Sequence, residues 1–159
     1  MNAIEWLKRQ HGHVCDLYAS YRQCDDEDEK QALFDELADN LAAHAIVEER
    51  LFYPGVFSGK RLEHIIDEHR GLKSELAELL ALAPEDSDFD QRLEQLFDLI
   101  ALHVEQEERE VLPIAAQQLG REELDRLGLE MEQLFEEVIS QPMSEAPPLA
   151  PGASLPLEG

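Results

Sequence analysis

Apolar residues recur every three or four positions along most of the chain, which is the spacing of amphipathic helices. This pattern predicts helices over about residues 4–24, 30–53, 60–83 and 89–120, followed by a shorter amphipathic helix over about 124–138. Acidic, glycine and proline residues mark the short connections between them. Short connections place consecutive helices antiparallel, so the chain is predicted to be all-α with four long helices around one core.

A polar motif that occurs twice interrupts the apolar stripes of the second and fourth helices. The segment from His44 to Pro54 and the segment from His103 to Pro113 both read H-x3-E-E-x4-P. A helix advances about 100° per residue, so a His and a Glu four positions apart lie one turn apart on the same face. Each copy therefore offers two side chains for half of a possible metal site.

The repeat extends to the first and third helices, each of which carries a histidine on its apolar stripe. His11 precedes His44 by nearly the same interval as that by which His69 precedes His103. The chain is thus predicted to contain two similar helical hairpins. A buried imidazole or carboxylate without a partner costs several kcal/mol, so six at comparable depth need a shared explanation. The candidate metal ligands are His11, His44, Glu48, His69, His103 and Glu107.

A centre of two metal ions supplies that explanation. Helix bundles build such centres from inward His and Glu side chains, with carboxylates bridging the ions and imidazoles as terminal ligands. His and carboxylate ligands without thiolates suit iron or manganese, and zinc is an alternative. A single His on an apolar face is more often a core residue bonded to a carbonyl, and His11 alone would be interpreted in that way. Four histidines in register favour metal.

Several polar neighbours of the motifs are assigned to the surface or to the surroundings of the ligands. The helical rotation places His13 and His64 off the stripes, facing solvent. The second Glu of each motif also points away, so Glu49 and Glu108 are expected to be solvated or to orient the imidazoles from behind. Their expected partners are Arg50 and Arg109.

The remaining candidates near the site are interpreted as packing residues. Cys15, one turn after His11, is expected to be a small core residue, with a redox role near the metal as the alternative. Packing roles are expected for Trp6, Phe52 and Tyr53.

Composition narrows the class of protein. There are 13 Lys and Arg residues against 36 Asp and Glu, and the net charge of −23 argues against binding nucleic acid or an anionic membrane through general electrostatics. No signal-peptide pattern and no apolar run long enough to span a membrane occurs, and Cys15 and Cys24 form no C-x-x-C pair, so a cytoplasmic setting is expected. One domain is predicted over 1–140, followed by a flexible tail over 141–159 that holds five of the eight prolines in the chain.

From about Ile4 to Ile114, the order of His11, the two H-x3-E-E motifs with their prolines, and His69 between them resembles the hemerythrin-like, or HHE cation-binding, domain family. The resemblance implies an up-and-down antiparallel four-helix bundle holding two iron ions, with an oxo or hydroxo bridge as an option. It further implies that the four histidines are terminal ligands and that Glu48 and Glu107 are bridges.

Two departures separate the chain from the oxygen carriers of that family. The carriers add a His one turn before the third-helix ligand, where this chain has Ile65. They also place the last carboxylate five residues after the fourth-helix His, at Glu108, whereas the helical stripe favours Glu107. Four His and two Glu are closer to iron-sulfur-cluster repair proteins and iron-sensing domains. The repair proteins carry a cysteine-containing N-terminal segment, whereas only ten residues precede His11 here.

The resemblance implies a centre that binds dioxygen, nitric oxide or peroxide for sensing, storage, iron handling or detoxification. A binding role is favoured, and peroxidase or oxidase turnover is the enzymatic version. Iron-sulfur-cluster repair is the alternative within the family. The alternative from another class is a metal-free acidic helical adaptor that binds a partner through its last helix and tail. This alternative leaves the buried His and Glu repeat unexplained.

Overall fold

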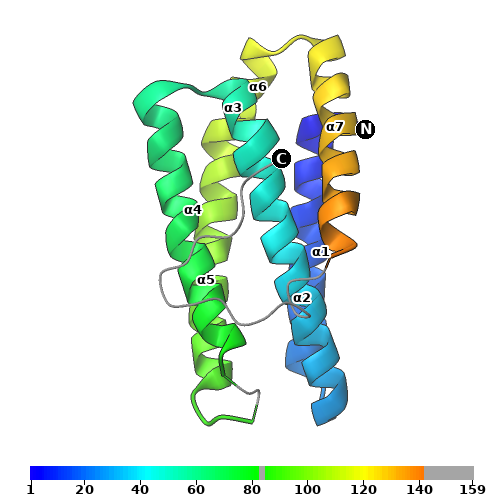
Figure 1. The fold of residues 1–159 in the computed structure, drawn as a ribbon, viewed down its shortest axis with the longest axis vertical. Helices are drawn as coiled ribbons and strands as arrows, with labels where there is room; N and C mark the ends of the chain where they lie inside the picture. The colour runs from blue at the N-terminus through cyan, green and yellow to red at the C-terminus, as the bar shows by residue number, and fades with distance from the viewer. Residues whose placement is uncertain (83–84, 142–159) are drawn as a thin grey trace.

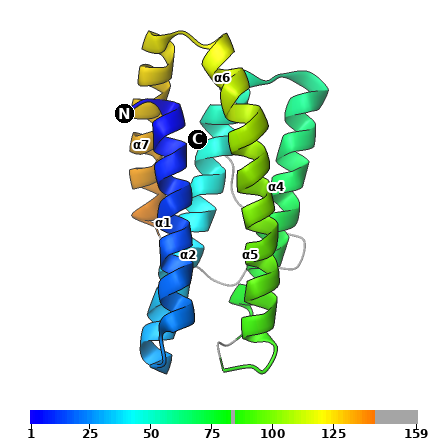
Figure 2. The same ribbon diagram turned by 180° about the vertical axis from the view of Figure 1, so that it is seen from behind.

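Long helices run side by side in the computed structural model, which describes residues 1–82 and 85–141. Figure 1 shows the long helices of the bundle, with α7 (Arg121–Ile139) lying beside α1 (Ala3–Gln23) and α2 (Glu27–Val47). Figure 2 shows the same arrangement from behind. The elements in chain order are α1 Ala3–Gln23, α2 Glu27–Val47, η1 Glu48–Phe52, α3 Tyr53–Val56, α4 Gly59–Leu80, α5 Phe89–Gln106, η2 Glu107–Val111, α6 Leu112–Gln118 and α7 Arg121–Ile139. The all-α prediction is confirmed, and no strand occurs in the part of the chain that the structure describes.

Local side chains fix where the first two helices begin. Asn2 accepts a hydrogen bond from the Glu5 amide at 2.9 Å, and the Glu5 carboxylate accepts one from the Asn2 amide at 3.1 Å. The two bonds form a capping box, which satisfies amides that the helix itself leaves free. Asp26, within the acidic residues 25–29 of the first connection, accepts a hydrogen bond from the Glu29 amide at 2.9 Å and so caps α2.

Two apolar clusters fill the interior at different heights along the bundle. On α1, Ala3, Trp6 and Leu7 belong to one cluster, while Val14 and Leu17 belong to the other. The segments that carry His44, His69 and His103 divide in the same way, with each candidate histidine between residues of the two clusters, whereas α7 contributes to the first cluster alone. The candidate ligands therefore form a polar layer that separates two apolar cores.

The last helix is longer than its apolar pattern predicts. α7 has 19 residues, because the charged residues after Gly120 already form its first turn. It packs against α1 and α2, and Leu124, Leu127 and Met131 complete the apolar cluster near the N-terminus. At Gly128, a Cβ atom would lie 2.5 Å from the Met1 carbonyl oxygen, so only glycine permits this approach of the backbones.

The predicted tail over 141–159 lies almost entirely outside the described residues, and the division at residue 140 stays a prediction. Within the described ranges, no helix is long and apolar enough to cross a membrane.

Candidate metal centre

The backbone hydrogen-bond pattern of the helix changes at the first glutamate of each H-x3-E-E motif. The amide of Tyr53 donates to the carbonyl of Glu48, and the amide of Leu112 donates to that of Glu107, five residues back in both cases. η1 and η2 are therefore single π-helical turns rather than α-helix. The proline that follows each turn has no amide hydrogen to continue the ladder, and π turns of this kind are frequent at functional sites.

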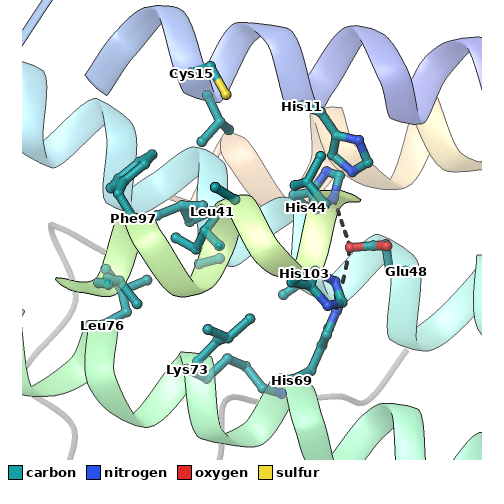
Figure 3. A pocket seen from close by; sticks show the side chains of 18 of the residues that line it. His11, Cys15, Leu41, His44, Glu48, His69, Lys73, Leu76, Phe97 and His103 are labelled. Carbon is teal, nitrogen blue, oxygen red and sulfur yellow. Dashed lines mark hydrogen bonds and ion pairs between the residues drawn. The ribbon is translucent and has the colours of Figure 1, made fainter. Parts of the chain in front are cut away.

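The structure brings all six candidate ligands into one layer, arranged as two overlapping groups of donor atoms. In each group, four donor atoms lie within 4.8 Å of one another. The first donor set is His11, His44, Glu48 and Glu107, and the second donor set is Glu48, His69, His103 and Glu107. Figure 3 shows the four histidines and Glu48 pointing toward one another; they come from α1, α2, α4, α5 and η1. Both carboxylates are shared, which is the arrangement that a pair of bridged cations requires.

The carboxylates link the two halves of the repeat. His44 Nε2 lies 2.7 Å from Glu48 Oε1, and His69 Nε2 lies 3.7 Å from the same oxygen. On the other side, Glu107 Oε1 lies 3.2 Å from His11 Nε2, and Glu107 Oε2 lies 3.4 Å from His103 Nε2. Each Glu thus faces one histidine from each hairpin.

Several of these close atoms make no hydrogen bond. Glu48 Oε1, Glu107 Oε1 and His11 Nε2 are buried and have no hydrogen-bond partner among the described residues. Leaving buried polar atoms unpaired is costly, and native interiors rarely do so without a reason. These unpaired atoms belong to residues of the two donor sets, which fits a cation as the missing partner.

Burial sets the protonation of the histidines in the metal-free site. It lowers the pKa of His44 to about 4, and burial together with the charge of His103 lowers the pKa of His69 to about 3. Both imidazoles are therefore neutral near pH 7, which is the form that binds metal. For His103, contact with Glu107 and Glu48 outweighs burial and raises the pKa.

The two carboxyl groups behave as a pair. Burial, followed by the neighbouring Glu107, raises the pKa of Glu48 well above its usual range. Burial acts in the same direction on Glu107, but its polar contacts with Glu48, His103 and His11 together hold its pKa well below the usual range. One proton is thus kept on Glu48 beside an ionised Glu107. A cation entering the site displaces that proton.

Tyr53 belongs to the site, although its sequence position predicted a packing role. Its hydroxyl lies 2.8 Å from Glu48 Oε2, 3.0 Å from His69 Nε2 and 3.4 Å from His103 Nε2. It also donates a hydrogen bond to Glu107 Oε2. The hydroxyl is therefore in contact with all members of the second donor set, whereas no hydroxyl contact is found for His11 or His44, the two histidines of the first donor set, among the described residues.

The second glutamates of the motifs take two different roles. Glu49 is buried and binds Lys73 of α4 at 2.8 and 2.9 Å, so the predicted solvated pairing with Arg50 is wrong. Glu108 Oε2 lies 3.3 Å from His11 Nδ1, the nitrogen on the far side of the ring from the first donor set. This contact agrees with the predicted alternative in which Glu108 orients an imidazole.

The surface assignments of the other histidines are confirmed, and the core assignment of Cys15 is wrong. His13 and His64 are exposed, and His64 pairs with Glu68 at 3.1 Å. Cys15 is exposed rather than part of the core, because α1 turns the adjacent Val14 inward.

Trp6 packs directly behind a candidate ligand. Its ring lies parallel to that of His44, with an interplanar angle of 7° and ring centres 6.2 Å apart. Phe135 of α7 makes an edge contact with the Trp6 ring, with the two ring centres 5.5 Å apart. Since this is the single Trp of the chain, its fluorescence reports on the surroundings of His44.

A pocket of about 400 Å³, here called the central pocket, opens onto the donor atoms from one side. His11, His44, Glu48, His69 and His103 form one end of it. Most of its remaining lining comes from apolar side chains of α1, α2, α4 and α5, of which Figure 3 labels Leu41, Leu76 and Phe97. A small ligand can therefore reach the layer of donors between the helices.

Comparison with known families agrees with this geometry. The family model described as "Hemerythrin HHE cation binding domain" matches residues 2–115. The chain therefore belongs to the hemerythrin HHE cation-binding domain family. The match includes both copies of the motif and all six candidate ligands.

Individual relatives cover the chain to different extents. A crystal structure of a hemerythrin HHE cation binding domain-containing protein from Mycobacterium kansasii superposes with a TM-score of 0.78 at 27% identity, over 89% of each chain. Uncharacterized proteins of Mycobacterium bovis and Mycobacterium tuberculosis are 27% identical over 146 residues, which are 90% of this chain and 91% of theirs. A protein of Nostoc sp. named DNA nickase is 29% identical over 133 residues, 82% of this chain but only 38% of that protein.

Proposed function

We propose that this chain is a non-haem di-iron protein whose centre binds a small ligand such as dioxygen, nitric oxide or peroxide. One observation carries the proposal: two buried donor sets share Glu48 and Glu107, and the shared oxygens include atoms without a hydrogen-bond partner among the described residues. Two sets with common carboxylates suit two cations a short distance apart. Iron is favoured over manganese or zinc by the family's typical metal and by a donor set of imidazole and carboxylate without thiolate.

The chain's own residues would divide the work between holding and orienting. His11 and His44 would bind one ion, His69 and His103 the other, and the two glutamates would bridge them. When bound, the ions would supply open coordination positions and redox chemistry for a small ligand. Glu108 holds the His11 ring from behind, and the Tyr53 hydroxyl orients Glu107 by donating a hydrogen bond to it.

The central pocket supports access by a small, weakly polar ligand. Its walls are largely apolar, and it ends at the histidines of both donor sets. Dioxygen and nitric oxide enter such surroundings at little cost, because they have no strong hydrogen bonds with water to lose. We therefore favour binding for sensing, storage or detoxification, with turnover of peroxide as the enzymatic version to be tested.

The DNA-nicking activity in the name of the Nostoc relative is not part of the proposal. That protein extends far beyond the matched region. This chain carries a net charge of −23, which opposes the approach of a phosphate backbone. A cytoplasmic setting is part of the proposal, supported by Cys15 and Cys24, which are both unpaired.

The test begins with anaerobic iron loading of the purified protein, followed by removal of free iron and metal analysis. We expect two ions per chain and a change in Trp6 fluorescence that saturates at the same ratio. Azide and then peroxide are next added while the absorption spectrum is recorded, and we expect both to change it.

A reproducible ratio of one ion or none would overturn the dinuclear centre. An unchanged spectrum with azide and with peroxide would overturn the open coordination positions. Failure to bind iron, manganese and zinc alike, with the same melting temperature with and without chelator, would favour the adaptor alternative instead.

A further inference from the structure

The central pocket is much larger than the small ligand proposed for the metal centre. Its volume is about 400 Å³, whereas one molecule of liquid water takes up roughly 30 Å³, and a diatomic ligand is of similar size. Folded interiors are close-packed and leave few voids larger than a water molecule. A pocket of this size beside a buried site therefore has room for a second, larger ligand.

The walls of the pocket define the chemistry of that occupant. Residues from all four helices of the bundle contribute, and their shared property is an aliphatic or aromatic side chain. These are Val14, Leu41, Leu72, Leu76, Leu96, Phe97, Ile100 and Val104. Ligand pockets of roughly 300–1,000 Å³ typically combine such walls with a few polar groups at one place. Here the histidines and Glu48 supply the polar end.

The charges around the pocket disfavour an anion. Among the lining residues, Lys73 is the one with a permanent positive charge, and Glu49 already holds its ammonium group at 2.8 and 2.9 Å. The lining also includes Glu105, which is exposed, and Glu108, which is partly exposed. Both carboxylates reach solvent at the edge of the pocket, and Glu108 lies close enough to the exposed Cys15 to act on it electrostatically. In the metal-free chain, a carboxylate or phosphate on the occupant would meet repulsion from these carboxylates, and the lysine of the lining is already paired with Glu49.

We propose that the central pocket binds a neutral aliphatic molecule that carries one hydroxyl or carbonyl group. The aliphatic part lies among the leucines, and the polar group faces the histidines and Glu48. This occupant is an organic compound, distinct from the small ligand of the metal centre. Its binding rests on the walls of the pocket and does not require metal, so it can be tested on the metal-free chain.

The experiment is calorimetric titration of the full, metal-free chain with 1-octanol, with octanoate as the anionic comparison. We expect saturable binding of one octanol per chain, with a negative heat-capacity change from burial of apolar surface. The melting temperature should rise with octanol concentration, because the ligand binds the folded state. Octanoate should bind at least about tenfold more weakly, a difference of roughly 1.4 kcal/mol.

Variants on α2 separate the pocket from general effects on the helix. Ala45 lines the pocket, and Ala32 is exposed on the same helix away from it. Ala45→Phe should lower octanol affinity at least about tenfold by filling the space, while Ala32→Phe should leave it unchanged. If Ala45→Phe does not fold, Ala101→Phe serves instead, because Ala101 is an exposed residue of the lining.

Three results would overturn the proposal: no saturable octanol binding, octanoate binding as tightly as octanol, or a folded Ala45→Phe that binds octanol like the unmodified chain. Iron loading followed through Trp6 fluorescence is an independent measurement. Normal iron stoichiometry without octanol binding would refute the pocket's organic ligand and leave the di-iron proposal standing. Octanol binding without iron uptake would refute the di-iron proposal and leave the pocket's organic ligand standing.

Discussion

Acid titration of the metal-free protein tests how His44 is held in the site. Burial lowers the pKa of His44 from 6.5 to about 4, so the folded protein binds fewer protons there than the unfolded chain. A lowered histidine pKa contributes stability that is present above the unfolded value and is lost as the pH falls through about 4. The full difference between the two pKa values corresponds to roughly 3 kcal/mol, of which about 2 kcal/mol is lost between pH 7 and pH 5.

The assay is urea unfolding in the presence of chelator at both pH values, comparing the unmodified chain with His44→Leu. The unmodified chain should lose about 2 kcal/mol more of its free energy of unfolding than the variant on going from pH 7 to pH 5. Glu48 contributes with the opposite sign, because its raised pKa makes its contribution fall as the pH rises. It is present in both proteins, so the comparison largely cancels it.

The matched control is His13→Leu, which replaces an exposed histidine of α1 outside the site. It should respond to pH as the unmodified chain does. The reasoning is refuted if His44→Leu and the unmodified chain lose the same free energy between the two pH values. That result would mean that His44 is hydrated or protonated in the folded, metal-free protein.

Three further substitutions test separate parts of the structure. Glu48→Gln should lower the iron content and shrink the melting-temperature difference between iron-loaded and chelated protein. Glu49→Gln should lower both melting temperatures and leave the difference between them unchanged. If the two variants show the same melting-temperature difference, the bridging role of Glu48 is contradicted. Tyr53→Phe leaves the buried carboxyl pair without a hydroxyl partner, so urea unfolding of the metal-free protein should show a loss of about 1–3 kcal/mol, and an unchanged stability would place the hydroxyl outside the pair. Gly128→Ala should lower the free energy of unfolding by about 1–3 kcal/mol, because the new Cβ meets backbone atoms. Gly12→Ala has open space around it and should leave the free energy of unfolding unchanged or raise it by up to about 1 kcal/mol. An effect of the same sign in both variants would contradict the close approach of the N-terminus to α7.

The candidate ligands could be found in the sequence because each lies on an α-helical stripe. From His11 to Val14 and from Leu41 to His44, the three-residue spacing of an α-helix holds, so periodicity identifies which polar residues face inward. The structure brings the four histidines and both first glutamates into one layer. Their role as ligands stays a prediction that metal analysis decides.

The contact of Tyr53 with the candidate ligands could not be predicted from the sequence, because the backbone hydrogen-bond spacing changes within the motif. In an α-helix, a residue five positions after Glu48 is rotated well away from it, which predicts packing against a different neighbour. The π turn holds more residues per turn and returns Tyr53 to the face of Glu48. The tyrosine just before the motif's proline was the available signal. Periodicity alone cannot detect a turn that departs from the α-helical period.

Contacts between segments that are distant in the sequence could also not be predicted from it. Glu49 points away from the apolar stripe of its own helix, as predicted. On that side it meets Lys73 of α4, a neighbouring helix, and not solvent. Whether a polar face meets water or a neighbouring helix depends on packing. The length of α7 was underestimated for a local reason, since periodicity counts apolar positions and the helix begins with charged ones.

The repeat of this chain is imperfect at one place that affects the whole centre. Tyr53 directly follows the first π turn, and Leu112 stands at the equivalent place after the second. Two perfect copies would give two interchangeable positions, and a half-filled protein would be an equal mixture of two forms. With a hydroxyl beside one position and not the other, the first ion to arrive has a preferred place. A preparation with one ion per chain should therefore give a single spectroscopic species.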